Sequence, residues 1–124
     1  MKKIVIATMI IGSMVLFADN CDNPKDDFDG LYCLNKIYIQ SDKELNSAYK
    51  ELRSMLSKEG KNILKREQLK WIKQRNNTCS YHDSRGFFVN LKCTTDKTVE
   101  RTNFLKDRIR ECKATGCQES KLTK

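Results

Sequence analysis

Apolar residues recur at helical spacing between residues 41 and 79, and this pattern restricts the stretch to amphipathic helices. Over residues 45–56 they repeat at i, i+3, i+4 and i+7, which is typical of a helix with one buried face. Further along, Gln68 and Arg75 fall on the same helical side as Trp71. Buried polar side chains are costly unless they have partners. We therefore expect a specific hydrogen-bond network that holds this second helix to its neighbours.

The ends of these two helices are predicted from a capping motif and a glycine. Ser41-x-x-Glu44 fits a capping box, so the first helix is predicted to begin at Ser41. Gly60 is predicted to end it, and Lys61 or Asn62 to open the second helix. So short a connection favours an antiparallel helix hairpin.

Two further stretches have helical spacing. Residues 31–40 form either a separate helix or an extension of the first one. Another helix is predicted to begin near Thr95 or Asp96. Four of its residues are predicted to face inward: Val99, Leu105, Ile109 and Cys112. Arg101 is predicted to lie on the margin of that inward face. The fold class is therefore predicted to be all-α, a small domain of three to four helices around the antiparallel hairpin.

Six cysteines can cross-link this helical body: Cys21, Cys33, Cys79, Cys93, Cys112 and Cys117. An even number in a small exported chain is typical of three disulfides. Of the 15 connectivities that six cysteines allow, short loops favour Cys21 with Cys33, Cys79 with Cys93, and Cys112 with Cys117. A zinc site made by Cys79-x-x-His82 and Cys93 is the alternative, and an oxidising compartment disfavours it.

The first 18 residues have the layout of a secretory signal peptide. Lys2 and Lys3 precede an apolar stretch over residues 4–17, and Ala18 precedes a polar pair. The stretch is shorter than the roughly 20 residues that a spanning helix needs. We therefore expect cleavage after Ala18 and a periplasmic or secreted chain without stable membrane insertion.

Loss of these 18 residues from the 124 leaves 106, and loss of two lysines lowers the formal charge from +8 to +6. A chain of this length forms one domain with a modest core. We expect that domain over residues 19–117, followed by a polar, frayed tail over residues 118–124.

Few residues could support catalysis. His82 is the only histidine, and no serine or cysteine has partners in sequence that would complete a triad. Asp26, Asp27 and Asp29 lack the ligand spacing of a calcium loop and lie in a turn-rich segment. We therefore expect a protein that is not an enzyme and that uses no metal or cofactor.

Positive charge is concentrated between Lys58 and Arg75, where seven basic residues stand against two acidic ones. Such a face can attract nucleic acid, anionic lipid or acidic glycans, or it can simply be solvated. Export argues against nucleic acid, as does the lack of stacking aromatic residues on this face. One hypothesis is therefore an envelope-associated adhesion module that uses this helix to bind an anionic glycan, lipid or protein.

Three motifs follow one another along the chain: Leu45-Asn46-x-x-Tyr49-x-x-Leu52, Gln68-x-x-Trp71-x-x-x-Arg75-x-x-x-Cys79, and Cys93-x-x-x-x-Thr98-x-x-Arg101-Thr102-x-x-Leu105. With the flanking cysteines and the signal peptide, they resemble the LprI-type lysozyme-inhibitor family of small exported bacterial proteins, over about residues 21–105. The resemblance implies a compact helical domain and structural roles for the motif residues. It also implies that the partner is lysozyme or another muralytic enzyme, inhibited by occlusion. Cys112 and Cys117 lie beyond the matched region.

The segment between Cys79 and Cys93 is the candidate contact with such a partner. A lysozyme cleft holds two catalytic carboxylates, so a tethered loop could insert a basic or hydroxyl-bearing side chain between them. The candidate residues are Arg85 as a cationic finger, with Tyr81, His82 and Ser84 beside it. Alternatively, residues 81–90 form a strand or loop that only closes the core with Phe87 and Phe88. A charge of +6 opposes long-range attraction to the strongly basic lysozymes of animal hosts.

Overall fold

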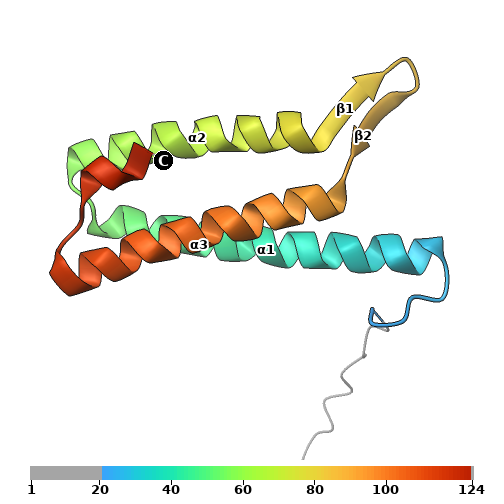
Figure 1. The fold of residues 1–124 in the computed structure, drawn as a ribbon, viewed down its shortest axis with the longest axis horizontal. Coiled ribbons are helices and arrows are strands. Elements are labelled where there is room, and N and C mark those ends of the chain that lie inside the picture. Colours follow the sequence, from blue (N-terminus) through green and yellow to red (C-terminus); the bar gives the residue numbers. More distant parts are fainter. Residues whose placement is uncertain (1–20, 124) are drawn as a thin grey trace, which may run out of the picture.

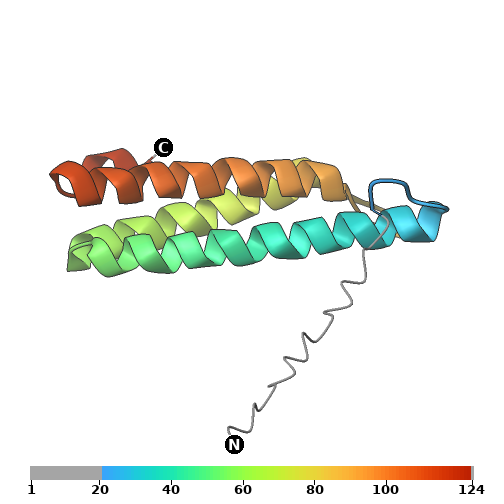
Figure 2. The same ribbon diagram turned by 90° about the horizontal axis from the view of Figure 1, so that it is seen from below.

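The computed structural model describes residues 21–123, so the expected signal peptide lies outside the described residues. The elements in order are α1 (Asp27–Met55), α2 (Lys58–Cys79), β1 (Ser80–Asp83), β2 (Gly86–Val89), α3 (Leu91–Thr115) and the short 3-10 helix η1 (Glu119–Thr123). The three long helices run alongside one another, and the β1–β2 hairpin extends from one end of the bundle (Figures 1 and 2). The all-α fold class is confirmed, with one small two-stranded sheet added.

Helix α1 is continuous through residues 31–40 and begins well before Ser41. Its N-cap is Asp26, whose carboxylate accepts a hydrogen bond of 2.8 Å from the backbone N–H of Asp29. The predicted helix start at Ser41 is wrong, because the Ser41 side chain is buried in mid-helix and donates to the carbonyl of Ile37 at 2.9 Å. A serine can satisfy its hydroxyl on the preceding turn as well as at a cap.

The connection between α1 and α2 lies earlier than predicted, at Leu56 and Ser57. Ser57 is the N-cap of α2, and its hydroxyl accepts a 3.0 Å hydrogen bond from the N–H of Gly60. Gly60 therefore lies in the first turn of α2 and does not end α1, and α2 does not open at residue 61 or 62. A Cβ at Gly60 would collide with the carboxylate of Glu119, which is held there by hydrogen bonds from the N–H and hydroxyl of Ser57.

The core lies where the three helices and η1 meet. Its buried apolar residues are Leu45, Ala48, Leu52, Leu56, Leu64, Leu105, Ile109 and Leu122. The most extensive helix packing is between α1 and α3, and η1 packs on α2. The predicted frayed tail is wrong: residues 119–123 form η1, and the Leu122 side chain is only 1% exposed.

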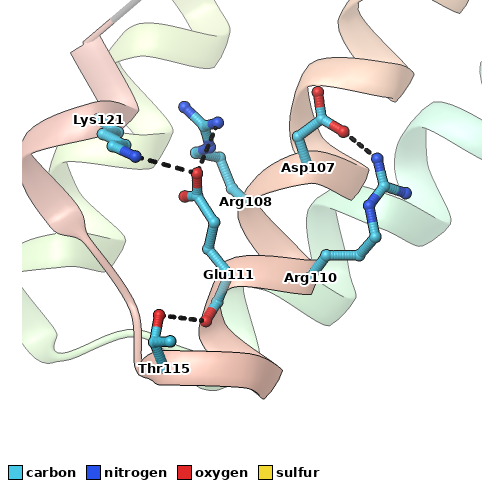
Figure 3. A network of polar contacts seen from close by, with 6 residues as sticks. All are labelled: Asp107, Arg108, Arg110, Glu111, Thr115 and Lys121. Carbon is cyan, nitrogen blue, oxygen red and sulfur yellow. Dashed lines mark hydrogen bonds and ion pairs between the residues drawn. The ribbon is translucent and has the colours of Figure 1, made fainter.

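A polar network fastens η1 to the end of α3. The carboxylate of Glu111 accepts hydrogen bonds from Arg108 at 2.9 Å and from Lys121 at 3.2 Å (Figure 3). Asp107 and Arg110 form a separate ion pair on the outer side of the same helix (Figure 3). Together with the Cys112–Cys117 disulfide, these contacts return the chain towards α2.

Helix α3 begins at Leu91, four or five residues before the predicted start at Thr95 or Asp96. Its N-cap is Asn90, whose side chain accepts a 2.9 Å hydrogen bond from the N–H of Cys93. Two predictions about its faces are wrong: Val99 is 44% exposed, and Arg101 is 4% exposed and central. The predicted inward positions of Leu105 and Ile109 are confirmed, with Cys112 packed against the core. The remaining inward residues are three threonines whose hydroxyls donate to the carbonyl four residues earlier; they are Thr94, Thr98 and Thr102.

The three disulfides join Cys21 to Cys33, Cys79 to Cys93, and Cys112 to Cys117, the pairing that short loops favour.

Across residues 21–123, none of the helices combines the length and the apolar character that crossing a membrane requires.

Candidate functional site

A buried polar network fixes α2 against α3 and so sets the direction in which the hairpin leaves the bundle. One guanidinium nitrogen of Arg75 donates to the hydroxyl of Thr98 at 3.2 Å. The Nε of Arg101 donates to the side-chain oxygen of Gln68 at 2.9 Å. All four side chains are buried. The network predicted from the inward placement of Gln68 and Arg75 is therefore present.

Trp71 lies between the two arginines of this network. The guanidinium carbons of Arg75 and Arg101 are 5.2 Å and 5.9 Å from its ring centroid, and Arg101 is also 4.6 Å from that of Phe104. Aromatic faces partly replace the water that a buried cation loses. Burial nevertheless lowers the pKa of Arg101 to about 10, because the charged form is less well hydrated. Arg101 still carries its charge at neutral pH.

The first family-like motif lines a groove between α1 and α2. Leu45 and Leu52 belong to the core, while Tyr49 packs against it and Asn46 is exposed. Leu45, Asn46 and Tyr49 line a groove of about 420 Å³ with Gln68 and other residues. The motif residues thus divide between the core, the polar network and this groove.

The hairpin holds all four residues proposed to contact a target. Tyr81 pairs with Phe88 and His82 with Phe87 across the two strands, and Ser84 and Arg85 form the turn. Gly86, which follows the turn, has a positive φ of +133° that side-chain-bearing residues rarely adopt. Tyr81, His82, Ser84 and Arg85 are all exposed.

Covalent and aromatic contacts stabilise this hairpin, which would be marginal alone. The Cys79–Cys93 disulfide closes its base, where the N–H of Asn90 also donates to the carbonyl of Cys79 at 2.8 Å. The rings of Tyr81 and Phe88 stack at 4.7 Å, and those of His82 and Phe87 lie 4.5 Å apart. Such cross-strand pairs each add a fraction of a kcal/mol to about 1 kcal/mol.

Phe87 is the most exposed large hydrophobic residue of the hairpin, at 85%. The alternative in which Phe87 helps to close the core is therefore wrong, although Phe88 is half-buried. Two adjacent residues of a strand point to opposite faces, and this rule could have identified one of the two phenylalanines as exposed. Val89, 59% exposed, lies two residues along the same strand and therefore on the same face. With Val89, Phe87 forms the kind of apolar patch that marks interaction sites, whereas Tyr81 stacks on Phe88 on the opposite face.

The tip of the hairpin carries an internal ion pair. The guanidinium of Arg85 donates to the carboxylate of Asp83 at 2.6 Å and 3.1 Å, and the backbone N–H of Arg85 donates to the same carboxylate at 2.8 Å. These hydrogen bonds hold the pKa of Asp83 below its usual range. Arg85 also lies 5.0 Å from the Phe88 ring centroid. The cationic finger predicted from the sequence is thus already paired with a carboxylate.

A groove of about 490 Å³ connects the base of the hairpin with α1. Its lining includes Asn35 and Tyr38 from α1, Arg75 from α2, Val89 from β2 and Leu91 from α3. The exposed face of the hairpin is therefore continuous with the side of α1.

Most basic residues of α2 are exposed and take no part in the buried polar network of Gln68, Arg75, Thr98 and Arg101. Five are exposed and are here called the basic face: Lys58, Lys65, Arg66, Lys70 and Lys73. Lys61 is half-buried, and Arg75 belongs to the buried network. Among residues 21–123, no three histidine, cysteine or acidic side chains are grouped as metal ligands.

Comparison with known proteins identifies one matching family. The model described as lysozyme inhibitor LprI matches residues 21–105, which include α1, α2, the hairpin and α3 as far as Leu105. No curated protein matches the chain, and no solved structure does.

Proposed function

The chain belongs to the LprI lysozyme-inhibitor family, and on that premise we propose that it binds a lysozyme or another muralytic enzyme and occludes the cleft with its β1–β2 hairpin. The protein would act by binding, without catalysis of its own. We further propose export to the periplasm or beyond, after removal of residues 1–18.

The observation that carries this proposal is the 85% exposure of Phe87 on a hairpin with a cross-linked base. Aromatic residues dominate the affinity of protein interfaces when they enter a pocket of the partner. A segment that is already rigid loses little conformational entropy on binding. The Cys79–Cys93 disulfide and the two cross-strand ring pairs supply that rigidity.

The polar residues of the hairpin tip fit a cleft that holds two carboxylates. Tyr81, His82 and Ser84 are exposed and can donate hydrogen bonds to carboxylate oxygens. Arg85 brings its own counter-ion, Asp83, so entry of the tip would not bury an unpaired charge. The contact is therefore expected to depend on Phe87 and the hydroxyl groups more than on the charge of Arg85.

The test is a turbidity assay of lysozyme acting on cell walls in the presence of the purified, oxidised protein. We expect inhibition by the oxidised form and its loss after reduction, because the hairpin then loses its closed base. Phe87→Ser should weaken inhibition about tenfold or more, the loss typical of a central aromatic anchor. The matched control is Val99→Ser, which removes an exposed apolar side chain from α3. Equal inhibition by wild type and Phe87→Ser would contradict the proposal.

The exposed basic face of α2 supports a second candidate function, capture of an anionic glycan, lipid or protein at the cell envelope. The dependence of binding on salt concentration distinguishes the two candidate functions. Capture by exposed lysines and arginines should weaken steeply between roughly 0.05 and 0.5 M salt, because these charges are screened. Inhibition through the hairpin should persist over the same range.

A further inference from the structure

One face of α1 forms the core seam, and this seam continues beyond the packed body of the protein. Its positions alternate in spacing between three and four residues: Leu31, Leu34, Tyr38, Ser41, Leu45, Ala48 and Leu52. This is the spacing of a helix that packs along one continuous stripe. From Ser41 onwards the seam is buried, whereas Leu31 is 57% exposed, Leu34 is 42% exposed and Tyr38 is half-buried. Leu31, Leu34 and Tyr38 are here called the open seam.

Helix α1 extends beyond the other two helices at the hairpin end (Figures 1 and 2), so its first turns, which carry Leu31 and Leu34, receive little cover from them. Tyr38 does contact α2, because the guanidinium carbon of Arg75 lies 5.9 Å from its ring centroid. Helix α2 gives way to β1 at Ser80, and α3 begins only at Leu91. Tyr38 lines the groove whose other side includes Val89 of β2 and residues of α2 and α3. Leu31 and Leu34 line a neighbouring hollow with residues 24–27. The open seam therefore reaches the exposed hairpin through Tyr38.

The segment that leads into α1 at this end is acidic, although the whole chain is strongly basic, at +8. Four aspartates lie within residues 22–29 and are here called the acidic rim: Asp22, Asp26, Asp27 and Asp29. Asp26 and Asp27 line one hollow with Leu31 and Leu34 of the open seam. Three of the four aspartates are exposed and Asp29 is half-buried, and only Lys25 offsets them within residues 21–30. The basic face begins at Lys58, at the other end of the bundle (Figure 1). Charge complementarity at the open seam therefore favours a cationic partner.

We propose that the open seam and its acidic rim form a second docking surface for the same partner as the hairpin, a cationic protein. This inference rests on the proposed function and narrows its partner to a basic lysozyme. The hairpin alone is small, and a stable interface usually covers about 800 Å² of each partner. The open seam supplies further apolar area on the same surface, and the acidic rim orients the basic enzyme despite the net positive charge of the inhibitor.

The experiment compares two double variants on α1 with matched exposure. Leu31→Ser with Leu34→Ser removes apolar residues of the open seam that are 57% and 42% exposed. Tyr32→Ser with Ile39→Ser removes residues that are 55% and 45% exposed and lie about a third of a turn away from the seam. The dissociation constant of each oxidised protein for an animal lysozyme is measured by calorimetry, with circular dichroism to verify that the helices persist.

We expect the seam variant to bind lysozyme about tenfold more weakly and the control variant to bind like wild type. Equal affinity of both variants, whether reduced or unchanged, would overturn the second docking surface while leaving inhibition by the wild type intact. A wild type that does not bind lysozyme would overturn the proposed function as well, so the two failures are distinguishable.

The acidic rim has its own readout. Asp22→Asn with Asp27→Asn should slow association with lysozyme at low salt, and the difference from wild type should vanish at high salt. Sedimentation of the protein alone tests the other occupant, a second copy of this chain. A wild-type dimer that the seam variant abolishes, combined with unchanged affinity for lysozyme, would overturn the proposal.

Discussion

At the scale of single residues, the bundle depends on a buried arginine that is satisfied by a glutamine. Arg101 is 4% exposed, donates to Gln68 at 2.9 Å and contacts the faces of Trp71 and Phe104. A buried charge is tolerated only when hydrogen bonds and polarisable neighbours replace its water. Gln68 is therefore expected to matter for stability even though its own side chain is uncharged.

Replacing Gln68 by leucine should destabilise the protein by about 2 kcal/mol, because Arg101 loses an acceptor within a buried site. Urea unfolding of the oxidised protein measures the change. Gln74→Leu, on the exposed side of the same helix, is the control and should alter the free energy of unfolding by no more than about 0.5 kcal/mol. A similar small effect of Gln68→Leu would show that the network does not hold α2 to α3.

The ion pair at the hairpin tip gives a pH-dependent prediction. The folded-state pKa of Asp83 is lowered by Arg85, so the pair stabilises the hairpin above the unfolded pKa of about 3.9. This contribution is lost as the pH falls through the folded pKa. Arg85→Gln should raise the pKa of Asp83 towards its ordinary value in an NMR titration. Arg110→Gln, which breaks an ion pair on α3, should leave it unchanged; an identical pKa in Arg85→Gln would refute the pairing.

At the scale of elements, the buried faces of the helices could be predicted better than their ends. Helical periodicity identified the inward side of α2, because Leu64, Gln68 and Arg75 recur at a spacing that allows one buried stripe. The ends depend on which of several cap residues is used. Ser57 and Asn90 cap α2 and α3, and neither is a stronger signal in the sequence than Ser41 or Gly60.

Which residues of α3 are buried, and which side of the hairpin is exposed, could not be predicted from the sequence. Threonines at 94, 98 and 102 satisfy their hydroxyls within the helix, so polar residues fill positions where periodicity predicts apolar ones, and Val99 is left outside. In the hairpin, the exposed phenylalanine depends on the register, which pairs Phe87 with His82. A shift of register by one residue would reverse the two faces.

The short helix η1 is predicted to be an essential part of the core. Leu122→Ala should destabilise the protein by about 3 kcal/mol, because it leaves a cavity at a residue that is 1% exposed. Chemical denaturation measures this change, and Ser120→Ala on the exposed side of η1 serves as control. Equal stability of the two variants would mean that the tail is dispensable, as the polar sequence alone suggested.

At the scale of the whole molecule, the distribution of charge over the surface is expected to affect binding of a basic enzyme more than the net charge does. The formal charge of +8 indicates repulsion of a basic enzyme. In the folded chain, however, the basic face lies on α2 while the acidic rim lies beside the open seam, at the end from which the hairpin extends. Composition could not show this separation, because it arises from the helix arrangement. The sequence motifs indicated the family; the folded chain supplies the surface that is proposed to act.

The most direct test of the proposed site is a photo-cross-link from the hairpin to the enzyme. Phe87→p-benzoylphenylalanine places the reactive group on the most exposed large hydrophobic residue of the hairpin, and Lys70→p-benzoylphenylalanine places it on the basic face of α2. Irradiation with lysozyme should give a cross-linked complex from position 87 that excess wild-type protein suppresses, and none from position 70. A cross-link from position 70 without one from position 87 would contradict occlusion by the hairpin.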